Sequence, residues 1–366
     1  MKFADYRIDE QLKQNIADQG FKRPTDIQFK SIPPVLKRED VLAIAQTGTG
    51  KTAAYVIPVL HNLLKKKIKT ANGIVRCVVM VPTHELASQT AKVFEQFSIG
   101  LGINSLFIHG GTDQQPQINK LKKGVEVLIA TPGRLFDLRS QGHIQLDKLE
   151  ILILDEADLM LDMGFINDIR DLLKFIPKKR QTLFFSATIS HKIKKLAYSI
   201  VQNPIRIQIS PKNPVSKNVF HYYAKIEMDH KRFFLERIVK ENPESKILCF
   251  VRTKVRAERV KAAMQRVDID SLTMHSDKEN KERTTNLSTF ASGAIKLLIA
   301  TDVSARGIDI PDVDIVINYD LPELTENYVH RVGRTGRGTK KVQPFPFALP
   351  KKTASERKLN TFWVSP

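Results

Sequence analysis

The sequence has 366 residues, of which 42% are hydrophobic, and its 58 basic against 39 acidic residues give a formal net charge of +19. This length predicts two domains, and the charge favours a polyanionic partner such as nucleic acid, although a merely basic surface explains it about equally well. The composition argues against a membrane protein, because no apolar stretch approaches the ~18 residues of a span, and against a disulfide-stapled secreted domain, because only two cysteines are present.

The two cysteines, Cys77 and Cys249, each lie inside an apolar run. This setting predicts small buried side chains rather than metal ligands or a disulfide pair. The N-terminus has no apolar signal core. Together these features predict a protein of the reducing cytoplasm that has no contact with membranes.

Short apolar runs, rich in β-branched residues, alternate with helical segments such as 88–97 and 163–175. The runs in the first half of the chain are residues 41–45, 75–81, 125–130, 149–154 and 183–186. Nearly continuous apolar runs are typical of strands that are buried on both faces. The alternation therefore predicts an α/β fold whose mostly parallel sheet is flanked by helices.

The alternation stops between residues 205 and 223, where Pro204, Pro211 and Pro214 interrupt a polar stretch. It resumes in runs 246–251, 297–300 and 315–318. The prediction is two α/β domains. The predicted boundaries are an N-terminal region 1–29, a first domain 30–208, a linker 209–218, a second domain 219–341 that is expected to be incomplete, and an aberrant tail 342–366.

A glycine-rich turn follows the first apolar run and leads into a helical segment. It consists of Ala45, Gln46, Thr47, Gly48, Thr49, Gly50, Lys51 and Thr52. A strand, a glycine-rich turn and a helix starting with Lys-Thr form the context of a phosphate-binding loop. Lys51 is expected to reach the β- and γ-phosphates, and the hydroxyl of Thr52 to ligate Mg²⁺. A chance glycine-rich turn is the weaker interpretation.

Acidic residues follow the run 149–154, at the strand end where ligands bind in open α/β sheets. Asp155 is the expected Mg²⁺ ligand, and Glu156 is the expected group that polarises the attacking water. A plain turn or helix cap is the alternative. Beside a phosphate-binding loop, the acidic pair predicts hydrolysis of a nucleotide.

These motifs make the chain resemble a DEAD-box ATP-dependent RNA helicase of superfamily 2, with the four family letters at residues 155–158. The resemblance runs from about Phe3 to Arg337, and its opening and compact linker most resemble the bacterial RhlE-type group. It implies two RecA-like domains, each a mostly parallel sheet flanked by helices. It also implies ATP and Mg²⁺ as cofactors, and a monomer that binds RNA largely without sequence preference.

The resemblance assigns further nucleotide contacts. Phe21 would stack on adenine, and Gln28, with Thr25 in the same Q motif, would read the adenine edge, since glutamine donates and accepts together. Ser186 and Thr188 match the motif that couples hydrolysis to strand separation, and their hydroxyls are expected to bond the acidic motif. In the second half, nucleotide contacts are expected from Gly307, Asp309, Arg331 and Arg334. Arg331 and Arg334 are the expected arginine fingers, which stabilise charge in the transition state.

The resemblance also implies RNA contacts, through backbone N–H groups, hydroxyls and arginine. Those expected from the first domain are Pro82, Thr83, Gly110, Gly111, Thr131, Pro132, Gly133 and Arg134. Those expected from the second domain are Arg252, Thr253, His275 and Thr301. One departure is His84, which stands where the family usually has arginine; a mostly neutral histidine is expected to weaken one phosphate or interdomain contact.

The tail is the larger departure from the family pattern. The family continues with a core strand, whereas residues 342–349 read Val-Gln-Pro-Phe-Pro-Phe-Ala-Leu, and two prolines predict a poor strand. Codons GGT ACA GCC ATT TCC TTT TGC TCT encode a family-like strand, and reading them one base later gives these eight residues. A frame-shifted readout from about Val342 is therefore our hypothesis; a clean reading frame in independent clones of the coding DNA would reject it.

Two alternatives to an unwinding enzyme stay open. The same motifs fit an ATP-gated RNA clamp, and the tail fits a catalytically crippled product of a frame-shifted gene. A DNA helicase is disfavoured, because Gln28 and the acidic motif together are typical of RNA enzymes in this superfamily.

Overall fold

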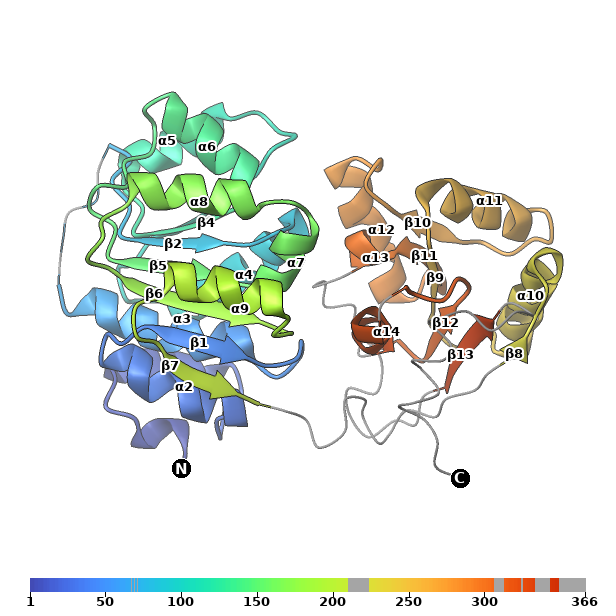
Figure 1. Ribbon diagram of the computed structural model, residues 1–366, viewed down its shortest axis with the longest axis horizontal. Coiled ribbons are helices and arrows are strands. Elements are labelled where there is room, and N and C mark those ends of the chain that lie inside the picture. The colour runs from blue at the N-terminus through green and yellow to red at the C-terminus, as the bar shows by residue number, and fades with distance from the viewer. Residues whose placement is uncertain are drawn as a thin grey trace. The chain divides into compact units, whose positions relative to one another are not determined.

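A computed structural model describes residues 1–66, 68, 70, 72–209, 224–305, 313–323, 325–332 and 343–348. The chain divides into two compact units, Met1–Ser210 and Pro211–Pro366. Each unit contains a parallel sheet with helices on both faces (Figure 1). The predicted α/β architecture, two units each built on a parallel sheet flanked by helices, is confirmed.

Unit 1 contains a seven-stranded sheet in the order β3-β4-β2-β5-β6-β1-β7, with every pairing parallel. The strands are β1 (Val41–Ile44), β2 (Cys77–Met80), β3 (Ser105–Ile108), β4 (Val127–Ala130), β5 (Ile151–Leu154), β6 (Gln181–Ser186) and β7 (Ile205–Gln208). The five apolar runs of the first half are all strands, as predicted.

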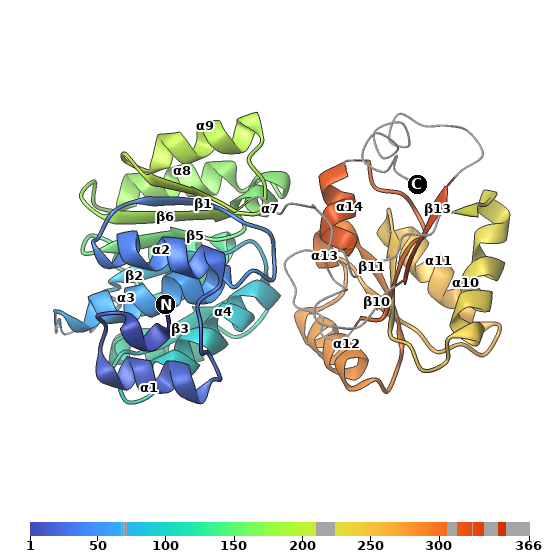
Figure 2. The same ribbon diagram turned by 90° about the horizontal axis from the view of Figure 1, so that it is seen from below.

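Helices of unit 1 cover the sheet on both sides. They are η1 (Phe3–Asp5), α1 (Glu10–Asp18), α2 (Asp26–Leu36), α3 (Lys51–Leu64), α4 (His84–Phe97), α5 (Gln115–Lys123), α6 (Pro132–Ser140), α7 (Ala157–Asp162), α8 (Ile166–Phe175) and α9 (His191–Ile200). Alternate residues of each strand face opposite sides. In β1, Val41 and Ala43 pack with residues of α1–α4, whereas Leu42 and Ile44 pack with residues of α5–α9. Figure 2 shows the two helix layers on either side of the strands.

Two strands of unit 1 were not predicted, and both lie at edges of the sheet. In β3 alternate residues are only partly buried, and in β7 only Ile207 is buried. An edge strand needs fewer apolar residues than a central one, so neither reads as a continuous apolar run. The expectation that the alternation of elements ends at residue 205 is therefore wrong by one strand.

Unit 2 contains a six-stranded sheet in the order β10-β11-β9-β12-β13-β8. The strands are β8 (Ala224–Lys225), β9 (Ile247–Val251), β10 (Leu272–Met274), β11 (Leu297–Thr301), β12 (Ile315–Asn318) and β13 (Gln343–Ala348). The helices are η2 (Met228–His230), α10 (Lys231–Glu241), α11 (Lys254–Gln265), α12 (Asn280–Ser292), α13 (Asp302–Ala305) and α14 (Thr325–Val332). Residues of α10 and α11 pack on one face of the sheet, and residues of α12 and α13 on the other.

Strand β13 corrects the expectation for the tail. Gln343–Ala348 pairs in parallel with β12 along four residues and with β8 at Phe347 and Ala348. A strand presents its N–H groups alternately to its two sides, and Pro344 and Pro346 are two residues apart. Their missing donors therefore fall on one side only, which is how these prolines fit within a sheet. The sheet has its strand beside β12, and the origin of the tail by frameshift stays a hypothesis.

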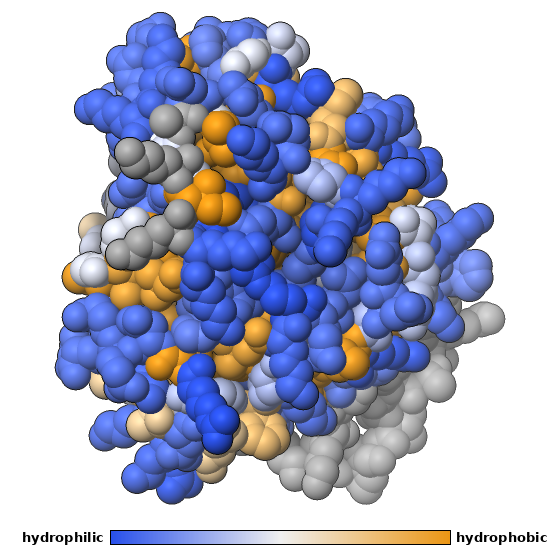
Figure 3. Space-filling view, turned by 90° about the vertical axis from the view of Figure 1, so that its left-hand side faces the viewer, coloured by the Kyte–Doolittle hydropathy of each residue, from blue (hydrophilic) through white to orange (hydrophobic). Residues whose placement is uncertain are grey.

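Both cysteines are free and buried, as predicted, and burial raises the pKa of each thiol. Hydrophilic residues cover most of the face in Figure 3, with hydrophobic residues between them in separate patches. Among the described residues, no helix has the length and apolar character needed to span a membrane.

Candidate nucleotide and RNA site

The phosphate-binding loop is the turn between β1 and α3. Gly48 and Gly50 have φ angles of +81° and +89°, which glycine adopts without strain. The hydroxyl of Thr49 donates to the carbonyl oxygen of Gln46 at 2.7 Å and closes the turn. Lys51 begins α3, a helix of 14 residues, so the unpaired N–H groups of its first turn border the loop. This arrangement is suited to an anion such as phosphate.

The Q motif is attached directly to this loop. The Gln28 side chain is 1% exposed; its Nε2 donates to the carbonyl oxygen of Gly50 at 3.1 Å, and its Oε1 accepts from the Thr25 backbone N–H at 2.9 Å. The Thr25 hydroxyl donates to the carbonyl oxygen of Thr49 at 2.8 Å. The Nε2 and Oε1 atoms of Gln28 each keep capacity for one more hydrogen bond. The predicted adenine reader is thus also a brace of the phosphate loop.

Phe21 lies beside this motif with 36% of its surface exposed. Its ring meets Phe3 and Phe97 edge to face, at centroid separations of 6.0 and 5.5 Å. These contacts hold the ring in place while part of it stays accessible, as stacking on a base requires.

The acidic pair follows the last residue of β5. Lys51 Nζ lies 2.8 Å from Glu156 Oε1, and both side chains are almost fully buried. Burial alone would lower the pKa of Lys51, but the carboxylates of Glu156, Asp155 and Asp158 outweigh it and raise that pKa. Glu156 has φ 50° and ψ 49°, a left-handed conformation that is unfavourable for glutamate. Such strain is concentrated at functional sites.

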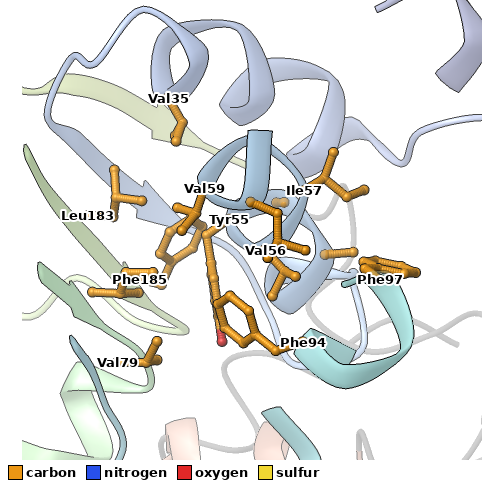
Figure 4. Packing of buried hydrophobic residues seen from close by; sticks show 14 of the residues in the cluster. Val35, Tyr55, Val56, Ile57, Val59, Val79, Phe94, Phe97, Leu183 and Phe185 are labelled. Atoms are coloured by element: carbon orange, nitrogen blue, oxygen red, sulfur yellow. The ribbon is translucent and has the colours of Figure 1, made fainter. Parts of the chain in front are cut away.

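Asp155 is buried beside this ion pair. One carboxylate oxygen accepts from the Tyr55 hydroxyl and the other from the Glu156 backbone N–H, both at 2.9 Å. Burial raises the pKa of Asp155 to about 6, although the Lys51 ammonium acts in the opposite direction. Tyr55 is itself packed between Phe94 and Phe185, as Figure 4 shows. The carboxylate is thus held rigidly while its negative charge is incompletely compensated.

The segment after β6 contacts the acidic motif, but not through the expected hydroxyls. The backbone N–H of Thr188 donates to Asp158 Oδ2 at 3.0 Å. The Ser186 hydroxyl donates to the carbonyl oxygen of Thr188 at 2.9 Å, which stabilises the turn instead. The two motifs are therefore linked through the main chain.

The expected RNA contacts of unit 1 lie after three neighbouring strands, β3, β4 and β2. Pro82 and Thr83 follow β2, the glycines 110–111 follow β3, and residues 131–134 follow β4. Thr83 caps α4 by accepting from the Leu86 N–H at 3.3 Å, and Arg134 donates to the carbonyl oxygen of Thr112 at 3.0 Å. At the carboxyl edge of this one sheet, the residues expected to bind RNA follow β3, β4 and β2. The residues expected to bind the nucleotide follow β5, β6 and β1.

The expected contacts of unit 2 also lie at the carboxyl ends of adjacent strands. Arg252 and Thr253 follow β9, His275 follows β10, and Thr301 ends β11. The Thr253 hydroxyl caps α11, and His275 Nε2 lies 2.7 Å from Glu258 Oε1. Gly307, Asp309 and Arg334 lie outside the described residues.

Arg331, one of the two expected arginine fingers, is hydrogen-bonded within its own unit. The side chain is 2% exposed, and it forms paired hydrogen bonds to both carboxylate oxygens of Asp302. Its remaining terminal nitrogen donates to Asn318 Oδ1 at 2.9 Å and to the carbonyl oxygen of Asp320 at 2.6 Å. The guanidinium is engaged within its own unit, which is the geometry of an internal brace.

Three contributing residues were not predicted. Tyr55 lies one helical turn after Lys51, so the i, i+4 spacing could have indicated it. Asp320 follows β12 as Asp155 follows β5, which is the signal that the acidic pair itself provided. Glu258 gave no signal, because its partner His275 lies in another element.

The fold and the site define the class of the protein: a nucleotide hydrolase with a phosphate-binding loop and two parallel α/β units. The DEAD/DEAH box helicase family model matches residues 25–196, and the model of the helicase conserved C-terminal domain matches residues 230–339. The chain therefore belongs to the DEAD-box family of ATP-dependent RNA helicases.

Individual proteins agree with this family. The ATP-dependent RNA helicase RhlB of Shewanella amazonensis is 38% identical over 95% of this chain and 80% of its own length. CshA of Listeria monocytogenes is 37% identical over 96% of this chain and 66% of its own. Among solved structures, S. cerevisiae Dbp5 bound to RNA and ADP BeF3 matches with a TM-score of 0.85 and 28% identity, over 98% of this chain and 92% of that one.

Proposed function

We propose that this chain hydrolyses ATP at the loop between β1 and α3, and that RNA stimulates the reaction and is locally unwound by it. The observation that carries the proposal is the buried Lys51–Glu156 ion pair, 2.8 Å long, beside Asp155. The pair places a phosphate-binding cation at the start of α3 beside a proton-accepting carboxylate at the strained residue that follows β5. The relatives named above support RNA as the substrate and a nucleotide as the energy source.

In the proposed mechanism, the loop N–H groups and Lys51 bind the phosphates, which frees Glu156 from its ion pair. Glu156 then orients water and accepts its proton. Phe21 and Gln28 select adenine, and the Gln28 bond to Gly50 couples adenine binding to the position of the loop. The hydrogen bond between Thr188 and Asp158 couples a movement of the acidic motif to the position of the segment after β6.

Magnesium fits this site. Asp155 is a buried carboxylate whose pKa is raised, so a cation would relieve an existing cost. Asp155 and Thr52 would hold the ion, which would neutralise phosphate charge when bound. Among the described residues, no group of three or more His, Cys, Asp or Glu side chains is placed to hold a metal ion.

RNA binding is proposed for the segments after β2, β3 and β4 and for the ends of β9, β10 and β11. These segments offer backbone N–H groups, capping hydroxyls and arginines, so affinity should fall with salt and vary little with sequence. Arg334 is the proposed arginine finger, whereas Arg331 is proposed as a brace. We also propose a monomer of the RhlE-type group; the relatives reported above bear other subgroup names.

The decisive test is RNA-stimulated ATPase activity of the wild type and of Glu156→Gln. Loss of the proton acceptor should lower kcat by roughly 10²–10³-fold while ATP binding persists. Glu150→Gln is the matched control, since Glu150 lies at the amino end of the same strand, paired with Arg76 at 2.6 Å. Equal rates for wild type and Glu156→Gln would reject the mechanism. Displacement of a short labelled RNA strand then separates unwinding from an ATP-gated clamp.

A further inference from the structure

Strand β12 of unit 2 carries an aspartate beyond each end, and both contact the neighbouring strand β9 in the same way. Asp314, before the strand, accepts from the Lys246 backbone N–H at 2.9 Å. Asp320, after the strand, accepts from the Arg252 backbone N–H at 3.0 Å. The two carboxylates thus perform the same structural task at opposite edges of the sheet.

Asp320 has further contacts at the carboxyl edge. Its Oδ1 accepts from the Arg256 guanidinium at 3.0 Å and lies 3.4 Å from Lys231 Nζ. The side chain of Lys231 is 2% exposed, and its ammonium also donates to the carbonyl oxygen of Tyr319. Burial lowers the pKa of Lys231, and the Asp320 carboxylate partly opposes that shift. A buried ammonium of this kind requires a carboxylate partner.

The main chain of Asp320 extends the same network to two other elements. Its carbonyl oxygen accepts from Arg331 of α14 at 2.6 Å. Arg331 in turn holds both carboxylate oxygens of Asp302, the residue after Thr301. Asp320 therefore contacts the turn after β9, the first turn of α11 and the start of α10. Through Arg331 of α14 it is also connected to the end of β11.

We propose that Asp320 is a positioning residue for RNA, which fixes the Arg252–Thr253 turn and, through Arg331, the end of β11 in one arrangement. The inference rests on the proposed RNA contacts of Arg252, Thr253 and Thr301. Both segments leave the same edge of adjacent strands, and a polyanion binds both more tightly if they are already held in one arrangement before it arrives. Asp320 itself touches no RNA; it acts through the backbone and cations that it orients.

The test compares Asp320→Asn with Asp314→Asn. Asparagine keeps the size, one acceptor oxygen and the main-chain bond to Arg331, but it cannot serve as counter-ion to Arg256 and Lys231. Asp320→Asn should raise the RNA concentration for half-maximal ATPase about tenfold, the loss of one charged hydrogen bond, with kcat at saturating RNA within about twofold of wild type. Asp314→Asn should change neither the half-saturating RNA concentration nor kcat. This should hold even if it lowers the melting temperature as much as Asp320→Asn does.

Two further variants protect the test from a folding defect. Arg256→Gln removes a partner whose side chain is about one-third exposed, so the fold should tolerate it, and the half-saturating RNA concentration should still rise several-fold. Asp320→Asn combined with Lys231→Met removes the buried ammonium together with its partner. The double variant should regain melting temperature but not RNA affinity.

Three results would decide against the proposal. Unchanged RNA dependence in both Arg256→Gln and the double variant would overturn it, as would an equal loss of RNA affinity in Asp314→Asn. Absence of RNA stimulation in the wild type would instead reject the proposed function, and the inference with it. Direct binding of a labelled single-stranded RNA, followed by fluorescence anisotropy, distinguishes a weakened RNA site from a slower hydrolysis step.

Discussion

Asp155 at the carboxyl edge of one sheet and Asp320 at the carboxyl edge of the other are both buried, but in opposite electrostatic surroundings. In unit 1, Asp155 receives two neutral hydrogen bonds, and burial raises its pKa to about 6. In unit 2, Asp320 and Asp302 face Lys231, Arg256 and Arg331 and are neutralised by the protein itself. Asp155 thus has an electrostatic cost that a cation can relieve, whereas Asp320 already has cationic partners within its own unit. The same substitution should therefore affect activity in one unit and stability in the other.

Asp155→Asn should give the largest effect. The predicted ATPase rate falls roughly 10²–10³-fold, because a group that stabilises transition-state charge is lost. Its folded-state pKa is raised above the unfolded value, so the ionised carboxylate destabilises the fold at pH 7, and the melting temperature should stay level or rise by a few degrees. Asp320→Asn should show the reverse pattern. A clear fall in the melting temperature of Asp155→Asn, followed by circular dichroism, would break the comparison.

Gly50→Ala examines how the neutral hydrogen bonds of the Q motif position the phosphate-binding loop of unit 1. A Cβ at this residue would collide with Gln28 Nε2, and the φ angle of +89° is unfavourable for alanine. The affinity for ATP should drop by at least about tenfold, since the loop and the Q motif move together. Gly142→Ala is the control, because its φ is +78° but no atom lies within 4 Å of a Cβ. Equal ATP affinity in the two variants, measured by calorimetry, would show that the contact is unimportant.

Glu258 supplies a pH test of unit 2. Partial burial raises its pKa, but hydrogen bonds from His275, Thr273 and Lys278 outweigh this and lower it to about 2. The folded pKa is below the unfolded value of about 4.3, so the stabilisation is present above that value and is lost as pH falls toward 2. Because the side chain is 44% exposed, we expect only about 1 kcal/mol.

Urea unfolding of Glu258→Gln and wild type should therefore differ at pH 7 and converge as the pH is lowered through this window. A difference that stays constant with pH would mean that the carboxylate contributes through packing rather than through charge.

His84→Arg should give the smallest effect, on the RNA side of unit 1. The His84 ring lies against His109 and Phe107, with centroids 4.1 and 4.9 Å apart. Arginine restores the family's usual cation, so RNA should bind about threefold more tightly, with the salt slope steeper by about one. His84→Gln is the neutral control, and a gain in that variant as well would attribute the effect to shape rather than charge.

Central strands and the nucleotide loop could be predicted from the sequence, because each depends on local pattern. Continuous apolar runs identified β1, β2, β4, β5 and β6, and the glycines with Lys51 identified the loop. The edge strands β3 and β7 escaped, because an edge needs few apolar residues. Strand β13 was rejected on the strength of Pro344 and Pro346, although their two-residue spacing already places both missing donors on one side of the strand.

The side-chain network of unit 2 could not be predicted for a different reason. Arg331 meets Asp302 and Asp320 from elements that are well separated along the chain, and no local spacing records that contact. Motif resemblance gave Arg331 the role of a finger, whereas the hydrogen bonds engage it as a brace. Spatial partners, rather than residue type, decide between these roles.

Strand β13 also has a consequence for biosynthesis. It lies between β12 and β8, so one of the last segments of unit 2 to be translated separates two that are made earlier. The sheet of unit 1 is complete once β7 has emerged from the ribosome, and that unit can fold while translation continues. Until residues 343–348 emerge, the sheet of unit 2 lacks the strand that pairs with both β12 and β8. The unpaired edges of these two strands are then available for a chaperone to bind.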